Sequence, residues 1–217
     1  MKKLGVYSFL AISALLLLCW VSPLTAYADT VTLTLENVGP GNNSGGVYTY
    51  PYSFSVDGSS SYVGLMCYDY TDEIYIGETW TATVVPINSS SPKDDLELAY
   101  LYSVASNPSS PAATAADAQW AAWELFDPGL TAPTSNGVTQ AGVTAELTAA
   151  GTADLSAYYS GYALYIPDRG WPENDGLPQS LIGLAPTPEP GSLVLLGTGL
   201  GLLAFAGAFY RRRRQTA

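Results

Sequence analysis

The chain of 217 residues contains no histidine and only two cysteines, Cys19 and Cys67. Histidine is the commonest general base and a frequent metal ligand, so its absence excludes a Ser-His-Asp hydrolase and a His-bound zinc enzyme. The adjacent Asp94 and Asp95 lie on a predicted helix and cannot face one another across a substrate. We therefore expect no enzyme activity, no cofactor and no bound metal.

Basic residues are scarce between Asp29 and Pro188. This stretch holds 18 of the 19 acidic residues but only Lys93 and Arg169 of the eight basic ones, which leaves a net charge of −16. A surface this negative repels the phosphates of nucleic acids and favours solubility. We expect no nucleic-acid partner.

The N-terminus has the pattern of a secretory signal peptide. Two lysines precede an apolar run (4–21), and a small-x-small sequence ends at Ala28, directly before Asp29. Positive charge, apolar core and small-residue cleavage site in this order are typical of an export signal. We predict a signal peptide over residues 1–28, with cleavage between Ala28 and Asp29.

The C-terminus has the pattern of a membrane span. An uncharged, mainly apolar run (192–210) follows a Pro-Glu-Pro motif, and four arginines come after it. Nineteen helical residues rise about 28 Å, close to the thickness of a bilayer's hydrocarbon core, and clustered arginines mark a cytoplasmic end. We predict a transmembrane helix over 192–210 whose cytoplasmic anchor is Arg211, Arg212, Arg213 and Arg214.

Residues 188–217 resemble the PEP-CTERM sorting signal of Gram-negative bacteria, which joins the motif Pro188, Glu189, Pro190 to a Gly-rich helix and an Arg-rich end. The resemblance implies processing by an exosortase, removal of the helix, and a place among bacteria that make exopolysaccharide. It also implies an inner-membrane-inserted precursor that ends at the cell surface or in the extracellular matrix. A permanent single-span anchor is the alternative.

Between these ends we expect one exported domain over residues 29–170, followed by a Pro-rich linker over 171–187. Its first half is rich in Thr, Val and Tyr and alternates polar with apolar residues, as half-buried strands do. Turn sequences rich in Gly, Asn and Ser separate the runs. The predicted strands are 31–35, 47–56, 62–70 and 78–87, with a returning strand at 162–166.

The second half of the domain has helical patterns. Ser91-Pro92 and Ser110-Pro111 each give a capping residue followed by proline at the first helical position. We predict helices from Pro92 to Ala105, over 112–126 and over 138–149. The fold class expected is α+β, a mainly antiparallel β-sheet or sandwich joined to a small helical lobe, flanked by the signal peptide and the transmembrane helix.

Loss of Cys19 with the signal peptide leaves Cys67 as the only cysteine of the exported domain, so it has no internal disulfide partner. Cys67 lies on a predicted strand, and Gln119 and Trp123 lie four residues apart on one face of a predicted helix. A cysteine on a strand and a glutamine on a packed helix are the two ingredients of an internal thioester.

Two segments resemble the thioester domains of surface proteins from Gram-positive bacteria. That family carries cysteine after an aromatic or apolar residue and often before Tyr-Asp, and a downstream Thr-Gln-x-Ala-Ile-Trp helix. Here the segments read Met66-Cys67-Tyr68-Asp69 and Ala118-Gln119-Trp120-Ala121-Ala122-Trp123, with alanine in place of the family's Thr and Ile. The resemblance implies a Cys67–Gln119 cross-link that captures an amine-bearing surface or matrix target.

Such a bond forms when the cysteine sulfur attacks the glutamine carbonyl carbon and ammonia leaves, and an external amine then displaces the sulfur. Aromatic side chains would shield the bond from water, and Tyr68 and Trp123 are the best placed to do so. The simpler interpretation makes Cys67 a small core residue and Gln119 a solvated one.

Two further patterns have open interpretations. Asp69, Asp72 and Glu73 form an acidic cluster that either binds calcium or lines a solvated turn. The tyrosines of the predicted sheet either stack on sugars or pack within the sheet. The alternative function is therefore a non-covalent structural or polysaccharide-associated matrix protein without a thioester.

Overall fold

The computed structural model describes residues 30–39, 43–44, 46–168, 178–186 and 199. Contacts divide the chain into two units, and the unit from Ala28 to Pro186 holds all the elements named below. Apart from Gly199, the other unit (1–27 and 187–217) lies outside the described residues. Within the described part, none of the helices combines the length and apolar character needed to cross a membrane. The predicted signal peptide, sorting motif and transmembrane helix stay predictions.

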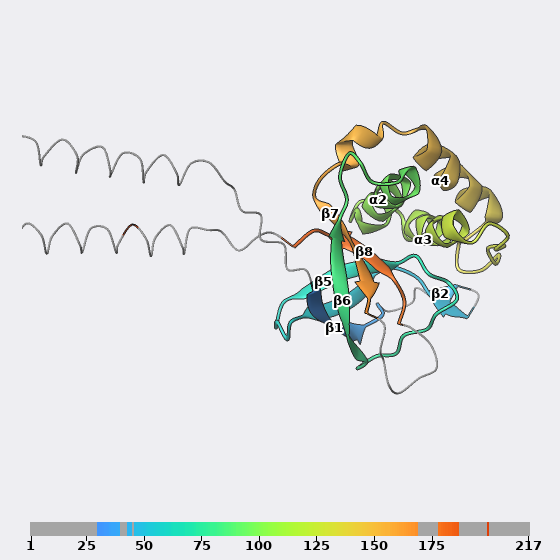
Figure 1. Ribbon diagram of the computed structural model, residues 1–217. Helices are drawn as coiled ribbons and strands as arrows, with labels where there is room; N and C mark the ends of the chain where they lie inside the picture. The colour runs from blue at the N-terminus through green and yellow to red at the C-terminus, as the bar shows by residue number, and fades with distance from the viewer. Residues whose placement is uncertain (1–29, 40–42, 45, 169–177, 187–198, 200–217) are drawn as a thin grey trace, which may run out of the picture. The chain divides into compact units, whose positions relative to one another are not determined.

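Six strands close into an antiparallel barrel in the order β1-β4-β5-β8-β7-β6 (Figure 1). A separate two-stranded ribbon pairs β2 with β3. The strands are β1 (Thr30–Asn37), β2 (Asn43–Ser44), β3 (Val47–Tyr48), β4 (Tyr52–Val56), β5 (Tyr62–Cys67), β6 (Thr79–Pro86), β7 (Tyr162–Pro167) and β8 (Leu181–Leu184).

The alternating pattern of the strands builds the barrel interior. On β1, Val31, Leu33 and Leu35 are buried while the threonines between them are half-buried, as a period of two requires. The register sets Leu33 beside Trp80 of β6 and Leu35 beside Phe54 of β4. The Phe54 and Trp80 rings meet edge to face at 5.8 Å between centroids, so the interior is filled by side chains.

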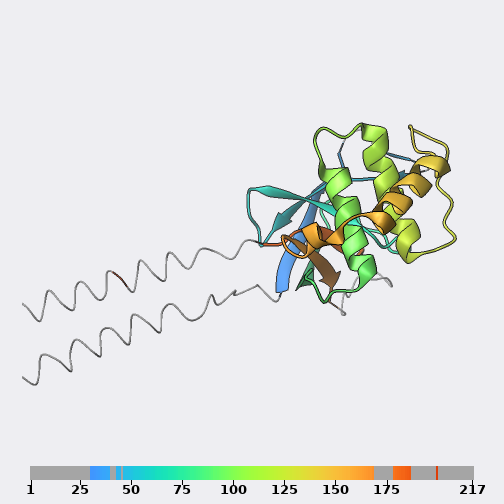
Figure 2. The ribbon, with the colours of Figure 1, turned by 90° about the horizontal axis from the view of Figure 1, so that it is seen from above.

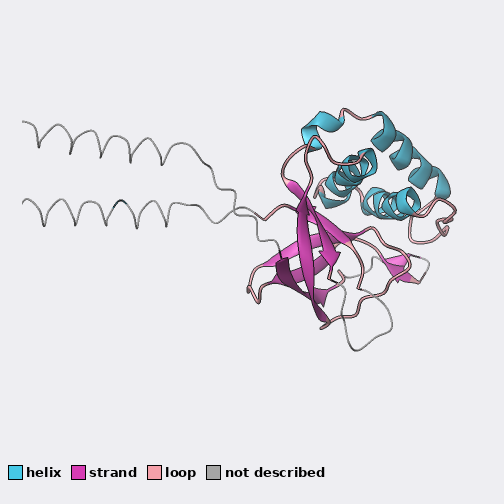
Figure 3. Cartoon of the chain, viewed as in Figure 1, coloured by secondary structure: helices cyan, strands magenta, loops and turns pink. Residues whose placement is uncertain are grey.

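The helices form a separate group between β6 and β7. They are α2 (Lys93–Ser106), α3 (Ala112–Phe126) and α4 (Gln140–Thr152), followed by a short 3₁₀ turn, η1 (Leu155–Tyr158). Figures 2 and 3 show the helices gathered beside the strands. Helix α2 contacts α3 and β8, and α3 contacts α4 and β5. The predicted α+β class with an antiparallel sheet and a small helical lobe is confirmed, and the strands form a barrel instead of a sandwich.

Two predicted strands are shorter in the structure. The run 47–56 is divided into β3 and β4 around Pro51, which has no N–H to donate to a ladder. The run 62–70 ends at Cys67, because the Asp69 carboxylate accepts from the backbone N and hydroxyl of Thr71 and begins a turn. This turn follows directly after Cys67 and therefore lies beside the predicted cross-link.

The largest difference concerns the predicted linker over 171–187. Leu181–Leu184 is strand β8, which pairs with β5 and β7 and closes the barrel. The short apolar run Leu181-Ile182-Gly183-Leu184 lies between prolines and gives too little periodicity to be recognised as a strand. The second half of this segment is therefore part of the domain, which extends beyond the predicted boundary at residue 170.

Helix α2 begins one residue later than predicted and α4 two residues later, at Gln140, whereas α3 begins at Ala112 as predicted. Pro92 and Pro111 are the N-cap residues of α2 and α3, and neither serine before them caps the helix. The Ser91 hydroxyl accepts from the Asn88 backbone, and the Ser110 hydroxyl donates to the Val104 carbonyl. Both serines therefore stabilise the preceding turns.

Candidate functional site

Cys67 is the last residue of β5 and is fully buried. The strand register places it opposite Leu181 of β8, one step after the pair formed by Met66 and Ile182. Alternation puts Cys67 on the same face as Leu65, toward the barrel interior, at the point where the strand ends beneath α3. The sulfur therefore lies at the junction of the barrel and the helices.

The Cys67 sulfur has two hydrogen-bond partners. The indole Nε1 of Trp123 donates to Sγ at 2.9 Å, and Sγ lies 3.4 Å from the carbonyl oxygen of Asp69, to which the thiol donates. Burial raises the pKa of the Cys67 thiol to about 12, against a smaller lowering by the Trp123 hydrogen bond. At neutral pH the thiol is therefore almost entirely protonated, so it is a poor nucleophile.

Gln119 meets Cys67 across 52 residues of sequence. Its side chain is fully buried on α3, and Nε2 donates to the Cys67 carbonyl oxygen. The amide oxygen Oε1 accepts from the backbone N of Tyr50 at 3.3 Å. The structure thus brings together the two residues of the predicted cross-link, and both ends of the Gln119 amide are held.

The Tyr50 backbone N–H has a chemical consequence that the sequence motifs do not reveal. When a nucleophile adds to an amide or thioester carbonyl, negative charge develops on the carbonyl oxygen. Tyr50 already donates to that oxygen of Gln119. The arrangement therefore provides a donor for acyl transfer at Gln119, and Trp123 provides a second donor at the sulfur.

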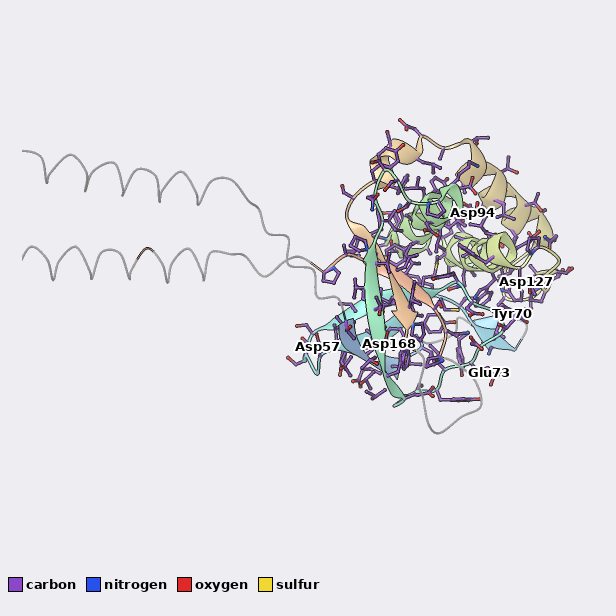
Figure 4. The ribbon with its side chains drawn as sticks, viewed as in Figure 1. Asp57, Tyr70, Glu73, Asp94, Asp127 and Asp168 are labelled. Carbon is purple, nitrogen blue, oxygen red and sulfur yellow. The ribbon has the colours of Figure 1, made fainter. Side chains whose placement is uncertain are left out.

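A layer of three aromatic rings covers this junction. Trp120 and Trp123 are nearly perpendicular, with centroids 5.0 Å apart, and the Tyr70 ring lies 5.6 Å from Trp120 and 5.3 Å from Trp123. The indoles are buried and Tyr70 is half-buried, so Tyr70 is the outer member. Figure 4 shows Tyr70 on the same side as Glu73 and away from Asp57. In the sequence, only its position three residues after Cys67 could have indicated that Tyr70 belongs to the site.

The two predicted shielding residues have different surroundings. Trp123 contacts the Cys67 sulfur directly. Tyr68 is half-buried and its ring packs against Phe126, with centroids 4.9 Å apart. Burial raises the pKa of Tyr68 to about 12, against a lowering by its hydrogen bond with Ser180. Tyr68 therefore lies beside the end of α3, and Tyr70 has the position over the indoles.

Gln179, just before β8, also belongs to the site and was not predicted from sequence. Its Nε2 donates to the carbonyl oxygens of Asp69, at 3.2 Å, and Asp72, at 2.6 Å. Asp69 O is also the acceptor for the Cys67 thiol. Gln179 lay in the predicted linker, where nothing in the sequence indicated a contact with the cysteine.

The predicted acidic cluster is engaged in the turn after β5. The carboxylate of Asp69 accepts from Thr71, and that of Glu73 accepts from the Tyr75 hydroxyl. Burial and the neighbouring Asp69 raise the pKa of Asp72. In the described ranges no group of three or more His, Cys, Asp or Glu side chains is placed to hold a metal ion.

The remaining predicted residues lie outside the described part of the chain, namely Ala28, Asp29, Pro188, Glu189, Pro190 and the four arginines from Arg211 to Arg214. Comparison with protein-family models, curated protein sequences and solved structures gives no match for this chain.

Proposed function

We propose that this protein is an exported surface or matrix protein that attaches covalently to an amine-bearing partner through a thioester between Cys67 and Gln119. The observation that carries the proposal is the hydrogen bond from Gln119 Nε2 to the backbone carbonyl of Cys67 at the end of β5. Both residues are fully buried and lie 52 positions apart in the sequence. A buried glutamine with both ends of its amide hydrogen-bonded, beside the only cysteine of the exported domain, differs from the solvated residue of the simpler interpretation.

The bond forms by acyl transfer within the folded chain. The Cys67 sulfur attacks the Gln119 side-chain carbonyl carbon, the bond from that carbon to Nε2 breaks, and ammonia leaves with the thiol proton. Folding holds the Gln119 amide against the Cys67 backbone carbonyl, so the two side chains share one buried junction. We propose that this closeness gives the sulfur a high effective concentration at the Gln119 carbonyl carbon, which offsets the poor nucleophilicity of the protonated thiol. No external oxidant or cofactor enters this step.

Capture of a partner breaks the thioester, and the Cys67 sulfur becomes the leaving group. A primary amine attacks the same carbon, the carbon–sulfur bond breaks, and Cys67 recovers a proton while Gln119 becomes a substituted amide. The Tyr50 N–H stabilises the charge on the carbonyl oxygen, and the Trp123 N–H stabilises the departing sulfur. Burial of both residues keeps water from competing with the amine.

The target is an amine on a surface or matrix polymer. Primary amines such as lysine side chains are cationic at neutral pH, and a domain with a net charge of −16 attracts them and repels anionic carriers. Before attack the amine must lose its proton, so reaction is faster at mildly alkaline pH. The processing partner we propose is an exosortase, with membrane insertion at least as a transient stage.

Intact-mass measurement tests the cross-link. Loss of ammonia lowers the mass of the purified protein by about 17 Da, and Cys67→Ala and Gln119→Ala remove the deficit. Methylamine then adds at Gln119 and exposes one thiol at Cys67. Freshly purified, untreated protein at full sequence mass, with one Cys67 thiol that alkylates once the chain is unfolded, would refute the bond.

Terminal peptides from the same preparations test export and sorting. We expect a mature chain that begins at Asp29 and lacks residues 211–217, because the cleavage pattern and the Pro188 motif lie at its two ends. Recovery of residues 211–217 in most mature molecules contradicts removal of the tail and supports a permanent anchor.

A non-covalent matrix role is the second candidate. Tyr48, Tyr62 and Tyr75 are 47%, 62% and 59% exposed, and exposed tyrosine rings suit stacking on sugars. Full sequence mass together with retention on immobilised exopolysaccharide, lost on replacing these tyrosines with alanine, favours this role over covalent attachment.

A further inference from the structure

The five residues after β5, Tyr68 to Asp72, form a segment that we call the cover loop. Its backbone is held from outside by the two residues before β8. Gln179 Nε2 donates to the carbonyls of Asp69 and Asp72, and Tyr68 N donates to the carbonyl of Ser180 at 3.1 Å. Both ends of the cover loop are thus fixed to a segment more than 100 residues away.

The Asp69 carbonyl connects this clamp to the site. It accepts from Gln179 Nε2 and from the Cys67 thiol, whose sulfur also accepts from Trp123. A carbonyl oxygen has two lone pairs, so both donors are satisfied at once. The hydrogen bonds run without interruption from Gln179 to the sulfur.

The cover loop also carries the outermost aromatic ring. Tyr70 is half-buried, and the Trp120 and Trp123 rings against which it packs are 3% and 2% exposed. Trp123 Nε1 contacts the Cys67 sulfur, and the Tyr70 ring lies outside Trp123. A reagent that approaches the sulfur from this side must therefore first displace the Tyr70 ring. Cys67 itself has no exposed surface, so reaction requires some part of its surroundings to move.

We propose that Gln179 is a positioning residue that latches the cover loop over Cys67 and thereby controls access to the site. Release of its two hydrogen bonds lets the Asp69–Asp72 turn lift, which moves Tyr70 away from the indoles and removes the acceptor of the Cys67 thiol. The importance of this latch for attachment rests on the proposed thioester, because an amine reaches Gln119 only when the loop is open. The latch itself acts on Cys67 whether or not the bond exists.

Alkylation of the Cys67 thiol by iodoacetamide measures loop opening directly. All variants carry Gln119→Ala, which leaves the thiol free irrespective of the thioester. Gln179→Ala removes both donors, and Gln179→Glu removes them with little change in size. Loss of two hydrogen bonds makes the open form about tenfold more populated, so both variants alkylate roughly ten times faster than their parent.

Gln140→Ala is the matched control. Gln140 is also half-buried and also makes two side-chain hydrogen bonds, with Ala132 N and with the Glu124 carboxylate, but it does not touch the cover loop. Its alkylation rate stays within about twofold of the parent rate. Urea unfolding of each variant separates loop opening from loss of global stability.

The urea dependence of alkylation in the parent gives a test without substitution at Gln179. Opening of the cover loop exposes little surface, so an alkylation rate limited by this opening is nearly constant in low urea. If the thiol reacts only after global unfolding, the alkylation rate rises with urea at the full slope of the unfolding curve. Three outcomes would each overturn the latch. The first is an equal alkylation rate in the parent and the Gln179 variants, and the second is an equal acceleration by Gln140→Ala. The third is an alkylation rate in the parent that rises in low urea with the full slope of the unfolding curve. Full sequence mass in the protein that retains Gln119, together with faster alkylation in the Gln179 variants, overturns only the proposed attachment.

Discussion

Replacing Trp123 by phenylalanine separates the two roles that we propose for its indole at Cys67. The substitution keeps an aromatic ring in the buried layer but removes the N–H that donates to Sγ at 2.9 Å. When an amine or water attacks the carbon of the proposed thioester, charge develops on the departing sulfur, and we expect the Trp123 N–H to stabilise it. Phenylalanine provides no donor, so both reactions slow down.

The magnitude follows from the charge on the acceptor. A hydrogen bond to a charged group contributes about 1.5–3 kcal/mol, and 1.4 kcal/mol corresponds to a factor of ten in rate. We expect Trp123→Phe to slow aminolysis by methylamine about ten- to a hundredfold. Trp123→Ala also loses the ring, so water reaches the site and solvates the sulfur, and the thioester hydrolyses faster than in the parent.

Trp120→Phe is the control for this experiment. Trp120 is the neighbouring buried indole, but its Nε1 has no hydrogen-bond partner among the described residues. The substitution therefore removes no bond, and the rate stays close to that of the parent.

The assay follows thiol release at Cys67 together with intact mass, after circular dichroism has shown that each variant is folded. Aminolysis in Trp123→Phe as fast as in Trp120→Phe refutes the role of the N–H. Hydrolysis in folded Trp123→Ala no faster than in the parent makes Trp123 a packing residue and refutes shielding.

Two predictions concern the helices and are read from urea unfolding. Burial raises the pKa values of Asp117 and Glu146 above their unfolded values, which are about 4. Their contribution to stability is therefore fully present below about pH 4 and is lost as pH rises through the folded pKa values. The unfolding midpoint should be higher at about pH 4 than at about pH 7.5, and the reverse order contradicts this account. Gly142→Ala on α4 should destabilise by about 1–3 kcal/mol, because its Cβ would overlap the Asp117 carboxylate, which Thr139 N holds in place. Gly151→Ala on the same helix meets only Glu97 Oε1, at 3.7 Å, and should stabilise by up to about 1 kcal/mol. Equal effects at the two glycines would rule out the steric argument.

The sequence predicts the parts of the domain whose signals are local. The alternation along β1 and the Ala-rich run of α3 depend on periods of two and of 3.6 residues, which are visible in a window of about ten residues. The pairing of Cys67 with Gln119 was also proposed from residue types and their order. The structure places these two in contact, and their covalent bond stays a prediction.

Other features depend on contacts between distant segments. Strand β8 has only four residues, and its assignment comes from the neighbours β5 and β7 that accept it at the closing edge of the barrel. Tyr68 adjoins Cys67 in sequence, but the end of β5 and the following turn direct its ring to Phe126 and bring Tyr70 over the indoles.

The sequence by itself determined a strongly acidic domain, an antiparallel sheet and a helical group, because composition and short-range periodicity encode these properties, and its two ends predict export and sorting. Only the tertiary structure decided that the sheet closes into a barrel, that the Tyr50 N–H meets Gln119, and that Gln179 holds the loop beside Cys67. The physical reason is that backbone donors and acceptors look alike in every sequence, so their partners are chosen by register and closure, which involve residues far apart in the chain.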